Sequence, residues 1–120
     1  MPAVLLFKGN QKMIKKYNKL IRDRILEIIK KSGEKPYWRV LDKKEYLQKI
    51  KRKILEEAEE LSKAQNKKAI INEIVDIQEL IDVLISELDL KKSQIKKEQA
   101  EKNKKRGGFK KRLFLIKTEK

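Results

Sequence analysis

Apolar side chains recur three or four residues apart along much of this chain, a spacing that predicts helices. A first helix is predicted over about residues 18–31, and the glycine of Ser32-Gly33 is expected to end it. A second helix is predicted over residues 42–64, with Asp42 as its N-cap and Glu45 as the capping-box partner. Each is expected to turn one apolar face towards a core.

The segment over about residues 68–88 is apolar nearly all round. Ile74 belongs to its main stripe, whereas Val75 and Leu80 lie on other faces. This pattern is typical of a buried helix. Because the connection at residues 65–67 is short, this helix is expected to be the antiparallel neighbour of the second. The predicted fold class is therefore all-α, an antiparallel helical bundle.

The two ends of the chain carry weaker patterns. A polar, exposed fourth helix is predicted over about residues 93–105, and the apolar run 113–116 is strand-like, with residues 38–40 as its expected partner. Residues 1–12 are expected to form a flexible N-terminal extension. The remainder, residues 13–120, is short enough to be one domain.

Two pairs of acidic residues lie where the predicted second and third helices would face each other. Glu57 and Glu60 are three residues apart, as are Glu73 and Asp76, so each pair shares one helix face. Like charges about 4 Å apart repel by roughly 4 kcal/mol at an effective dielectric constant of 20. Such a cluster needs a cation, and Mg²⁺ is the divalent ion that all-oxygen ligands suit best. The alternative is an ordinary solvated glutamate face with i,i+4 lysine pairs.

The charge of the chain is strongly positive but unevenly distributed. It has 33 Lys and Arg against 18 Asp and Glu, a net charge of +15. Residues 1–53 and 90–120 carry net charges of +12 and +10, whereas residues 54–89 carry −7. A negative centre between positive arms suits a metal cluster that takes a polyanionic substrate. The same arms would also suit a nucleic acid, which leaves that partner as an open alternative.

Missing residue types exclude several kinds of chemistry. With no cysteine there is neither a disulfide framework nor a thiolate metal site, and with no histidine there is no imidazole catalysis. No apolar run reaches the length of about 20 residues that a membrane span needs. The chain is expected to be cytoplasmic and to work without a membrane.

Four sequence blocks, in this order, resemble the MazG-like all-α nucleoside triphosphate pyrophosphohydrolases, especially the phosphoribosyl-ATP pyrophosphohydrolase-like subgroup. The acidic signature of that superfamily, EExxE followed by ExxD, matches Glu56-Glu57-x-x-Glu60 and Glu73-x-x-Asp76. The other three blocks are Tyr17-Asn18-Lys19-Leu20-Ile21-Arg22-Asp23, Arg39-Val40-Leu41 with Glu45-Tyr46, and Lys105-Arg106-Gly107-Gly108-Phe109.

This resemblance implies hydrolysis of a nucleoside triphosphate to the monophosphate and pyrophosphate by metal-activated water. Glu57, Glu60, Glu73 and Asp76 match the family's metal ligands, with Mg²⁺ as the expected ion and Mn²⁺ as its substitute. Glu56 and Glu57 are the expected catalytic residues, since a carboxylate beside the metal can accept a proton from water. Glu56 matches the first acid of the motif, which either ligates the ion directly or holds a metal-bound water. With no histidine or cysteine present, direct attack by water is favoured over a covalent intermediate.

Basic residues in three places are candidates for holding the substrate's phosphates. Each also has a plainer interpretation: Lys53 could pair with Glu57, the N-terminal pair could simply be solvated, and Gly107 with Gly108 could be a helix C-cap instead of a closing flap. The candidates are Lys19, Arg22, Lys53, Lys102, Lys105 and Arg106.

Three functions therefore compete. The favoured one is a Mg²⁺-dependent pyrophosphohydrolase acting on a free nucleotide. The second has the same chemistry with phosphoribosyl-ATP of histidine biosynthesis as substrate. The third is a non-enzymatic basic helical module that binds nucleic acid or a partner protein. In each case the third helix has more apolar surface than one small chain can cover, so a homodimer or a dimer of dimers is expected to complete the bundle.

Overall fold

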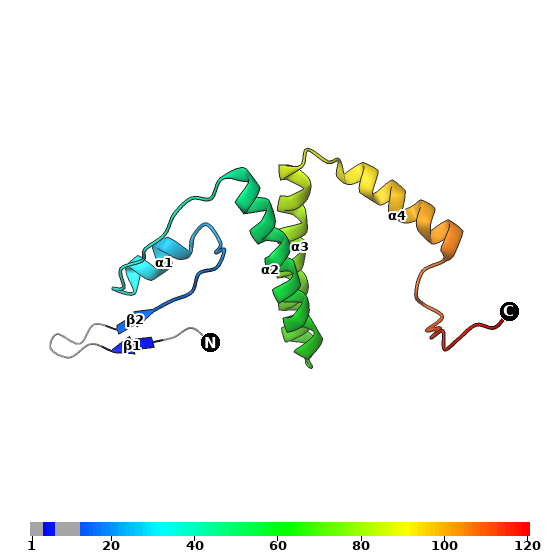
Figure 1. Cartoon of the computed structure of the whole chain (residues 1–120), viewed down its shortest axis with the longest axis horizontal. Helices are drawn as coiled ribbons and strands as arrows, with labels where there is room; N and C mark the ends of the chain where they lie inside the picture. Colours follow the sequence, from blue (N-terminus) through cyan, green and yellow to red (C-terminus); the bar gives the residue numbers. More distant parts are fainter. Residues whose placement is uncertain (1–3, 7–12) are drawn as a thin grey trace. The chain divides into compact units, whose positions relative to one another are not determined.

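The computed structural model of the chain, which describes residues 4–6 and 13–120, is mainly helical, as the sequence predicts (Figure 1). Its contacts divide the chain into two compact units, Met1–Leu80 and Ile81–Lys120. Among the described residues, no helix is both long enough and apolar enough to cross a membrane. The elements in chain order are β1 (Val4–Leu6), β2 (Met13–Lys15), α1 (Ile25–Lys31), α2 (Lys43–Lys63), α3 (Lys67–Glu87) and α4 (Lys92–Arg106).

The small sheet lies at the N-terminus and not where the sequence predicts it. β1 pairs with β2 in antiparallel register, with Leu5 opposite Ile14. Residues 113–116 and 38–40 form no strand, so the predicted C-terminal pairing is wrong. The run 113–116 is exposed along its whole length, so no burial of its apolar side chains favours a strand there. The predicted extension 1–12 contains β1, and its remaining residues lie outside the described part of the chain.

Helix α1 is shorter than predicted because the chain turns before it. Asn18 has a left-handed backbone with φ of +48°, which a helix cannot contain, and Ile25 N–H donates to Arg22 C=O at 3.1 Å in a turn. The predicted end is confirmed. Gly33 has φ of +88° and its N–H donates to Lys30 C=O, as expected for a glycine that ends a helix.

Helix α2 begins at the predicted cap, but only half of the capping box forms. Asp42 Oδ1 accepts the Glu45 N–H at 2.9 Å. The Glu45 carboxylate instead accepts two bonds from Arg39, at 3.0 and 2.7 Å. A bidentate guanidinium pair is stronger than a neutral backbone bond, which explains the exchange. It also lowers the pKa of Glu45 and raises that of Arg39.

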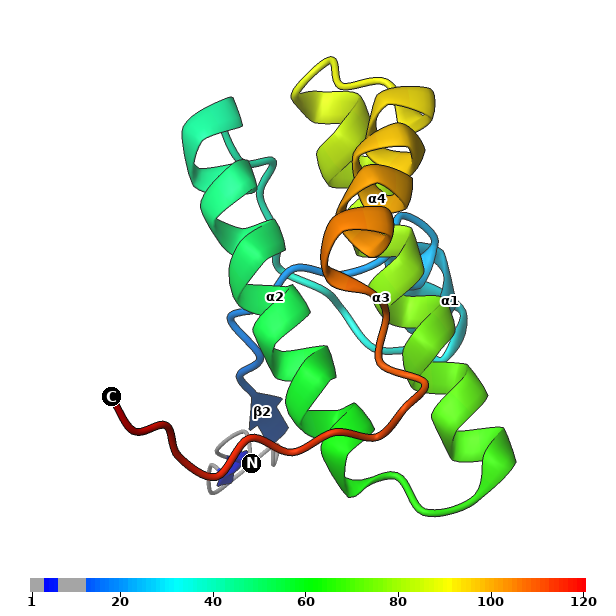
Figure 2. The same ribbon diagram turned by 90° about the vertical axis from the view of Figure 1, so that its right-hand side faces the viewer.

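Helix α3 follows α2 after the three-residue connection Ala64–Asn66, and in this first unit the two helices run in opposite directions (Figure 2). Asn66 Oδ1 caps α3 by accepting the Ala69 N–H at 2.8 Å. The predicted antiparallel hairpin is therefore present.

The prediction that α3 is buried is wrong for a single chain. Among residues 13–120, Ile50 of α2 and Ile85 of α3 are the buried hydrophobic residues. On the first half of α3, Ile71, Ile74 and Val75 stay more than half exposed. One neighbouring helix covers one face of α3, and an all-round apolar helix has more than one face to cover.

Helix α4, in the second unit, confirms the prediction of an exposed polar helix. All of its residues are exposed, and most of its charge is basic. It ends at Gly107, whose φ is +79° and whose N–H donates to Asn103 C=O at 2.8 Å.

Candidate active site

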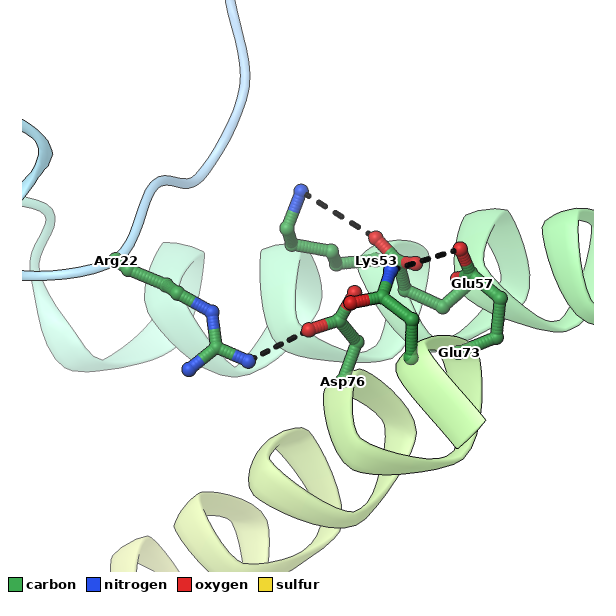
Figure 3. A network of polar contacts seen from close by, with 6 residues as sticks. Arg22, Lys53, Glu57, Glu73 and Asp76 are labelled. Atoms are coloured by element: carbon green, nitrogen blue, oxygen red, sulfur yellow. Dashed lines mark hydrogen bonds and ion pairs between the residues drawn. The ribbon is translucent and has the colours of Figure 1, made fainter. Parts of the chain in front are cut away.

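Three carboxylates of the acidic signature meet on the α2–α3 hairpin. Glu57 lies on α2 at the edge of its apolar face, while Glu73 and Asp76 lie one turn apart on α3. One oxygen from each carboxylate lies within 4.8 Å of the other two (Figure 3). We call Glu57, Glu73 and Asp76 the acidic triad. The short turn between the helices brings its two sides together.

The electrostatics of the triad are unfavourable without a cation. The pKa of Glu57 is raised from 4.5 to about 7, first by a hydrogen bond to Glu73, then by burial and by the charges of Glu73 and Asp76. That hydrogen bond needs a proton on one carboxylate, because two ionised carboxylates have no donor. Among the described residues, Glu73 Oε2 is buried and has no hydrogen-bond partner. The triad therefore holds an anionic atom that its own neighbours leave unsatisfied.

Two basic side chains lie against the triad. Lys53 Nζ is 4.0 Å from Glu57 Oε1, and both side chains are mostly buried, at 20% and 16% exposed. Arg22 reaches Asp76 from the segment before α1, with its Nη2 at 2.6 Å from Asp76 Oδ1 (Figure 3). Of the two interpretations of Lys53, the structure shows the pairing with Glu57. For Arg22, the sequence suggested a phosphate contact and gave no sign of an acidic partner.

The other two acids of the signature are not members of the triad. Glu56 and Glu60 are exposed on α2, and neither belongs to the group whose oxygens lie within 4.8 Å. Glu60 is three residues after Glu57, so the two side chains lie on the same side of the helix. The structure therefore brings together three of the four predicted ligands, and the roles of Glu56 and Glu60 stay predictions.

The remaining predicted phosphate contacts lie on exposed segments. Lys19 Nζ lies 5.4 Å from the centre of the Tyr17 ring, a cation–π contact. Lys102, Lys105 and Arg106 are exposed on α4 in the second unit. Their role in binding substrate stays a prediction, while the plainer interpretation of the glycine pair, a helix C-cap, is the conformation present.

The site includes one further polar residue, which was not among the residues predicted from the sequence. Asn72 Nδ2 lies 3.5 Å from Glu73 Oε1, at the outer limit of a hydrogen bond. Its only signal in the sequence is its position directly before the ExxD motif, which is too common to be informative. The pairing of Arg22 with Asp76 left no signal at all, because the two residues are 54 positions apart.

The triad has the donor set of a site for a hard divalent cation. It offers carboxylate oxygens alone, one of them buried and unsatisfied, and its charges repel one another. Mg²⁺ and Mn²⁺ prefer such oxygens, whereas softer metals prefer the histidine and cysteine that this chain lacks. The residues present therefore fit a divalent ion of this class.

A helical hairpin that carries EExxE on one arm and ExxD on the other defines the class of MazG-like all-α pyrophosphohydrolases. A sequence model of the phosphoribosyl-ATP pyrophosphohydrolase family matches residues 14–103, three quarters of the chain, and the chain belongs to this family. It is therefore a hydrolase that acts on phosphoric anhydride bonds. No curated protein and no solved structure matched the chain in the two other comparisons.

Proposed function

We propose that the protein is a Mg²⁺-dependent pyrophosphohydrolase that cleaves a free nucleoside triphosphate to the monophosphate and pyrophosphate. The observation that carries this proposal is the acidic triad, in which three carboxylates converge and one buried oxygen has no partner. Family membership supports the bond that is broken, and the all-oxygen donor set supports the ion.

Glu57, Glu73 and Asp76 would hold the divalent ion. A bound divalent ion neutralises phosphate charge and makes water a better nucleophile at neutral pH. Glu57 would enter that site as a carboxylate, because a metal ligand gives up its proton when the ion binds. Glu60, on the same side of α2 as Glu57, is the proposed fourth ligand.

Glu56 is proposed as the base that accepts a proton from the attacking water. Its carboxylate is exposed on α2, and it directly precedes Glu57 in the sequence. Water would attack the α-phosphorus in line with the leaving pyrophosphate. The chain has neither histidine nor cysteine to act as a nucleophile, which supports a direct displacement.

Phosphoribosyl-ATP is the second candidate substrate. The description of the matching family favours it, because that family is named for hydrolysis of this compound. The two candidates share the bond that is broken and the acidic triad, so a substrate comparison separates them. Membership of an enzyme family weighs against the third alternative, a basic module without activity.

We also propose that two copies of the chain associate through α3. Ile71, Ile74 and Val75 are 59%, 52% and 52% exposed, and a groove of about 570 Å³ lies along the first turns of this helix. With two buried hydrophobic residues in its described part, a single chain has a very small core. A second copy would cover the exposed face of α3 and supply the missing core. Sedimentation at micromolar concentration should show a dimer or tetramer, and Val75→Glu should shift it towards monomer.

The activity is tested with a panel of nucleoside triphosphates and phosphoribosyl-ATP, assayed with Mg²⁺ for both pyrophosphate and monophosphate. Glu57→Gln and Asp76→Asn are expected to lower kcat/KM by about a hundredfold or more, equivalent to about 3 kcal/mol of transition-state stabilisation. Glu59→Gln is the matched control, because Glu59 is an exposed glutamate of the same helix outside the triad. Undiminished activity in Glu57→Gln and Asp76→Asn would exclude the triad as the active site.

A further inference from the structure

The shortest ion pair of the candidate site joins Arg22 to Asp76, which lies on another element. Arg22 Nη2 lies 2.6 Å from Asp76 Oδ1, although the two residues are 54 positions apart (Figure 3). Arg24, two residues further on, pairs with its own neighbour Glu27 at 3.9 Å. The guanidinium of Arg22 thus crosses from the segment before α1 to the acidic triad, and its side chain remains 55% exposed.

The position of Arg22 conflicts with a divalent ion in the triad. A cation held by Glu57, Glu73 and Asp76 would put a second positive charge on the carboxylate that already accepts from Arg22. Two like charges at this separation repel. Arg22 therefore competes with the ion when no other anion is present.

A nucleotide's phosphates would remove this conflict. The guanidinium has a planar fork of donors that fits phosphate oxygens as well as it fits a carboxylate. Arg22 is exposed on one side, so it can exchange partners without leaving a buried charge unpaired. The anion that arrives with the divalent ion can then take the place of Asp76.

We propose that Arg22 is a positioning residue that is handed over from Asp76 to a phosphate group of the substrate when the divalent ion binds. It holds Asp76 in place in the metal-free protein and binds the polyphosphate in the loaded one. This inference rests on the proposed function. It makes the metal and the nucleotide bind with positive coupling, and the coupling is reciprocal.

The handover predicts opposite effects on two affinities when Arg22 is replaced by Gln. Without nucleotide, Mn²⁺ should bind about 1.5- to 5-fold more tightly, because a partly exposed ion pair that opposes the ion is worth about 0.2–1 kcal/mol. In wild type the nucleotide should increase the affinity for Mn²⁺ by some factor. In Arg22→Gln this factor should be smaller by about tenfold or more, because a charge-assisted bond to phosphate is lost. A merely structural role for Arg22 would weaken Mn²⁺ binding, since Asp76 would lose its support.

The experiment titrates the full chain with Mn²⁺ and follows the free ion by electron paramagnetic resonance, alone and with α,β-methylene-ATP, which cannot be cleaved between the α and β phosphates. Arg22→Gln is compared with wild type and with Arg24→Gln, which removes the same charge from the same segment without touching the triad. Arg22→Lys should restore part of the coupling, because it keeps the charge but not the fork.

We expect Arg22→Gln to bind Mn²⁺ more tightly and to lose the coupling to nucleotide. We expect Arg24→Gln to show neither change. Unchanged or weaker Mn²⁺ binding in Arg22→Gln would overturn the handover, even if wild type binds the ion and releases pyrophosphate. A wild-type protein that binds no Mn²⁺ would overturn the handover and the proposed metal site together. The two failures are therefore distinct.

Discussion

Replacing Glu57 with Gln is expected to stabilise the metal-free protein at pH 8. The folded protein raises the pKa of Glu57 from 4.5 to about 7, first through the hydrogen bond to Glu73 and then through burial and the neighbouring charges. At 1.36 kcal/mol for each pH unit, this amounts to at most about 3 kcal/mol against the charged form. The Gln amide carries no charge and can donate to Glu73, as the protonated acid does.

The pH dependence follows from the direction of the shift. Below pH 4.5 Glu57 is protonated in both the folded and unfolded states, so it costs nothing. As the pH rises from 4.5 to about 7 the unfolded state loses this proton first, and the stability of the folded protein falls. The difference between wild type and Glu57→Gln should therefore be small at pH 4 and reach up to about 3 kcal/mol at pH 8.

Urea unfolding with a chelator, at pH 4 and pH 8, measures this difference. Protein concentration must be the same throughout, because an associating chain unfolds at a midpoint that depends on concentration. Added Mg²⁺ should raise the stability of wild type at pH 8 but not that of Glu57→Gln. Glu59→Gln, an exposed change on the same helix, should match wild type in every condition. A Glu57→Gln protein less stable than wild type at pH 8, or a difference that does not change with pH, would refute the reasoning.

Three further substitutions test individual features of the fold by urea unfolding at pH 7. Asp42→Ala should cost about 1 kcal/mol by removing the cap on the Glu45 N–H, and an unchanged midpoint would mean that α2 does not need it. Gly33→Ala should lower the free energy of unfolding by about 1–2 kcal/mol because the φ of Gly33 is +88°, although a Cβ there would meet nothing within 4 Å. Gly108 is equally open and has no positive φ, so Gly108→Ala is the control and should be neutral. Glu45→Gln should lower stability at pH 7, and this loss should shrink as the pH falls towards 3, because Arg39 lowers the pKa of Glu45 and the contribution is lost on acidification. Equal losses at both pH values would contradict this.

Local signals in the sequence were enough to predict the helices and the hairpin. The Asp42 cap, Gly33 and the short connection before α3 each act within a few residues, and each lies where it was predicted. The start of α1 was misplaced because helical periodicity continues through the segment that turns at Asn18. Periodicity reports which side chains are apolar and does not report a left-handed backbone.

Long-range pairing was the part that the sequence could not provide. The spacing of Glu57, Glu73 and Asp76 predicted a shared face, and their oxygens do converge. Nothing in the sequence indicated that Arg22 would reach Asp76, because an exposed arginine has many acids within reach of its long side chain. The exposed face of α3, by contrast, agrees with the prediction that this helix has more apolar surface than one chain can cover.

All three triad residues lie between positions 57 and 76, on two helices joined by Ala64–Asn66. Closing so short a loop takes little entropy and little time, so the site can form as soon as the hairpin does, before any distant segment is in place. Chemistry carried by one supersecondary unit can survive insertions, fusions and changes of terminus elsewhere in a gene. The site would tolerate a lengthening of this turn least.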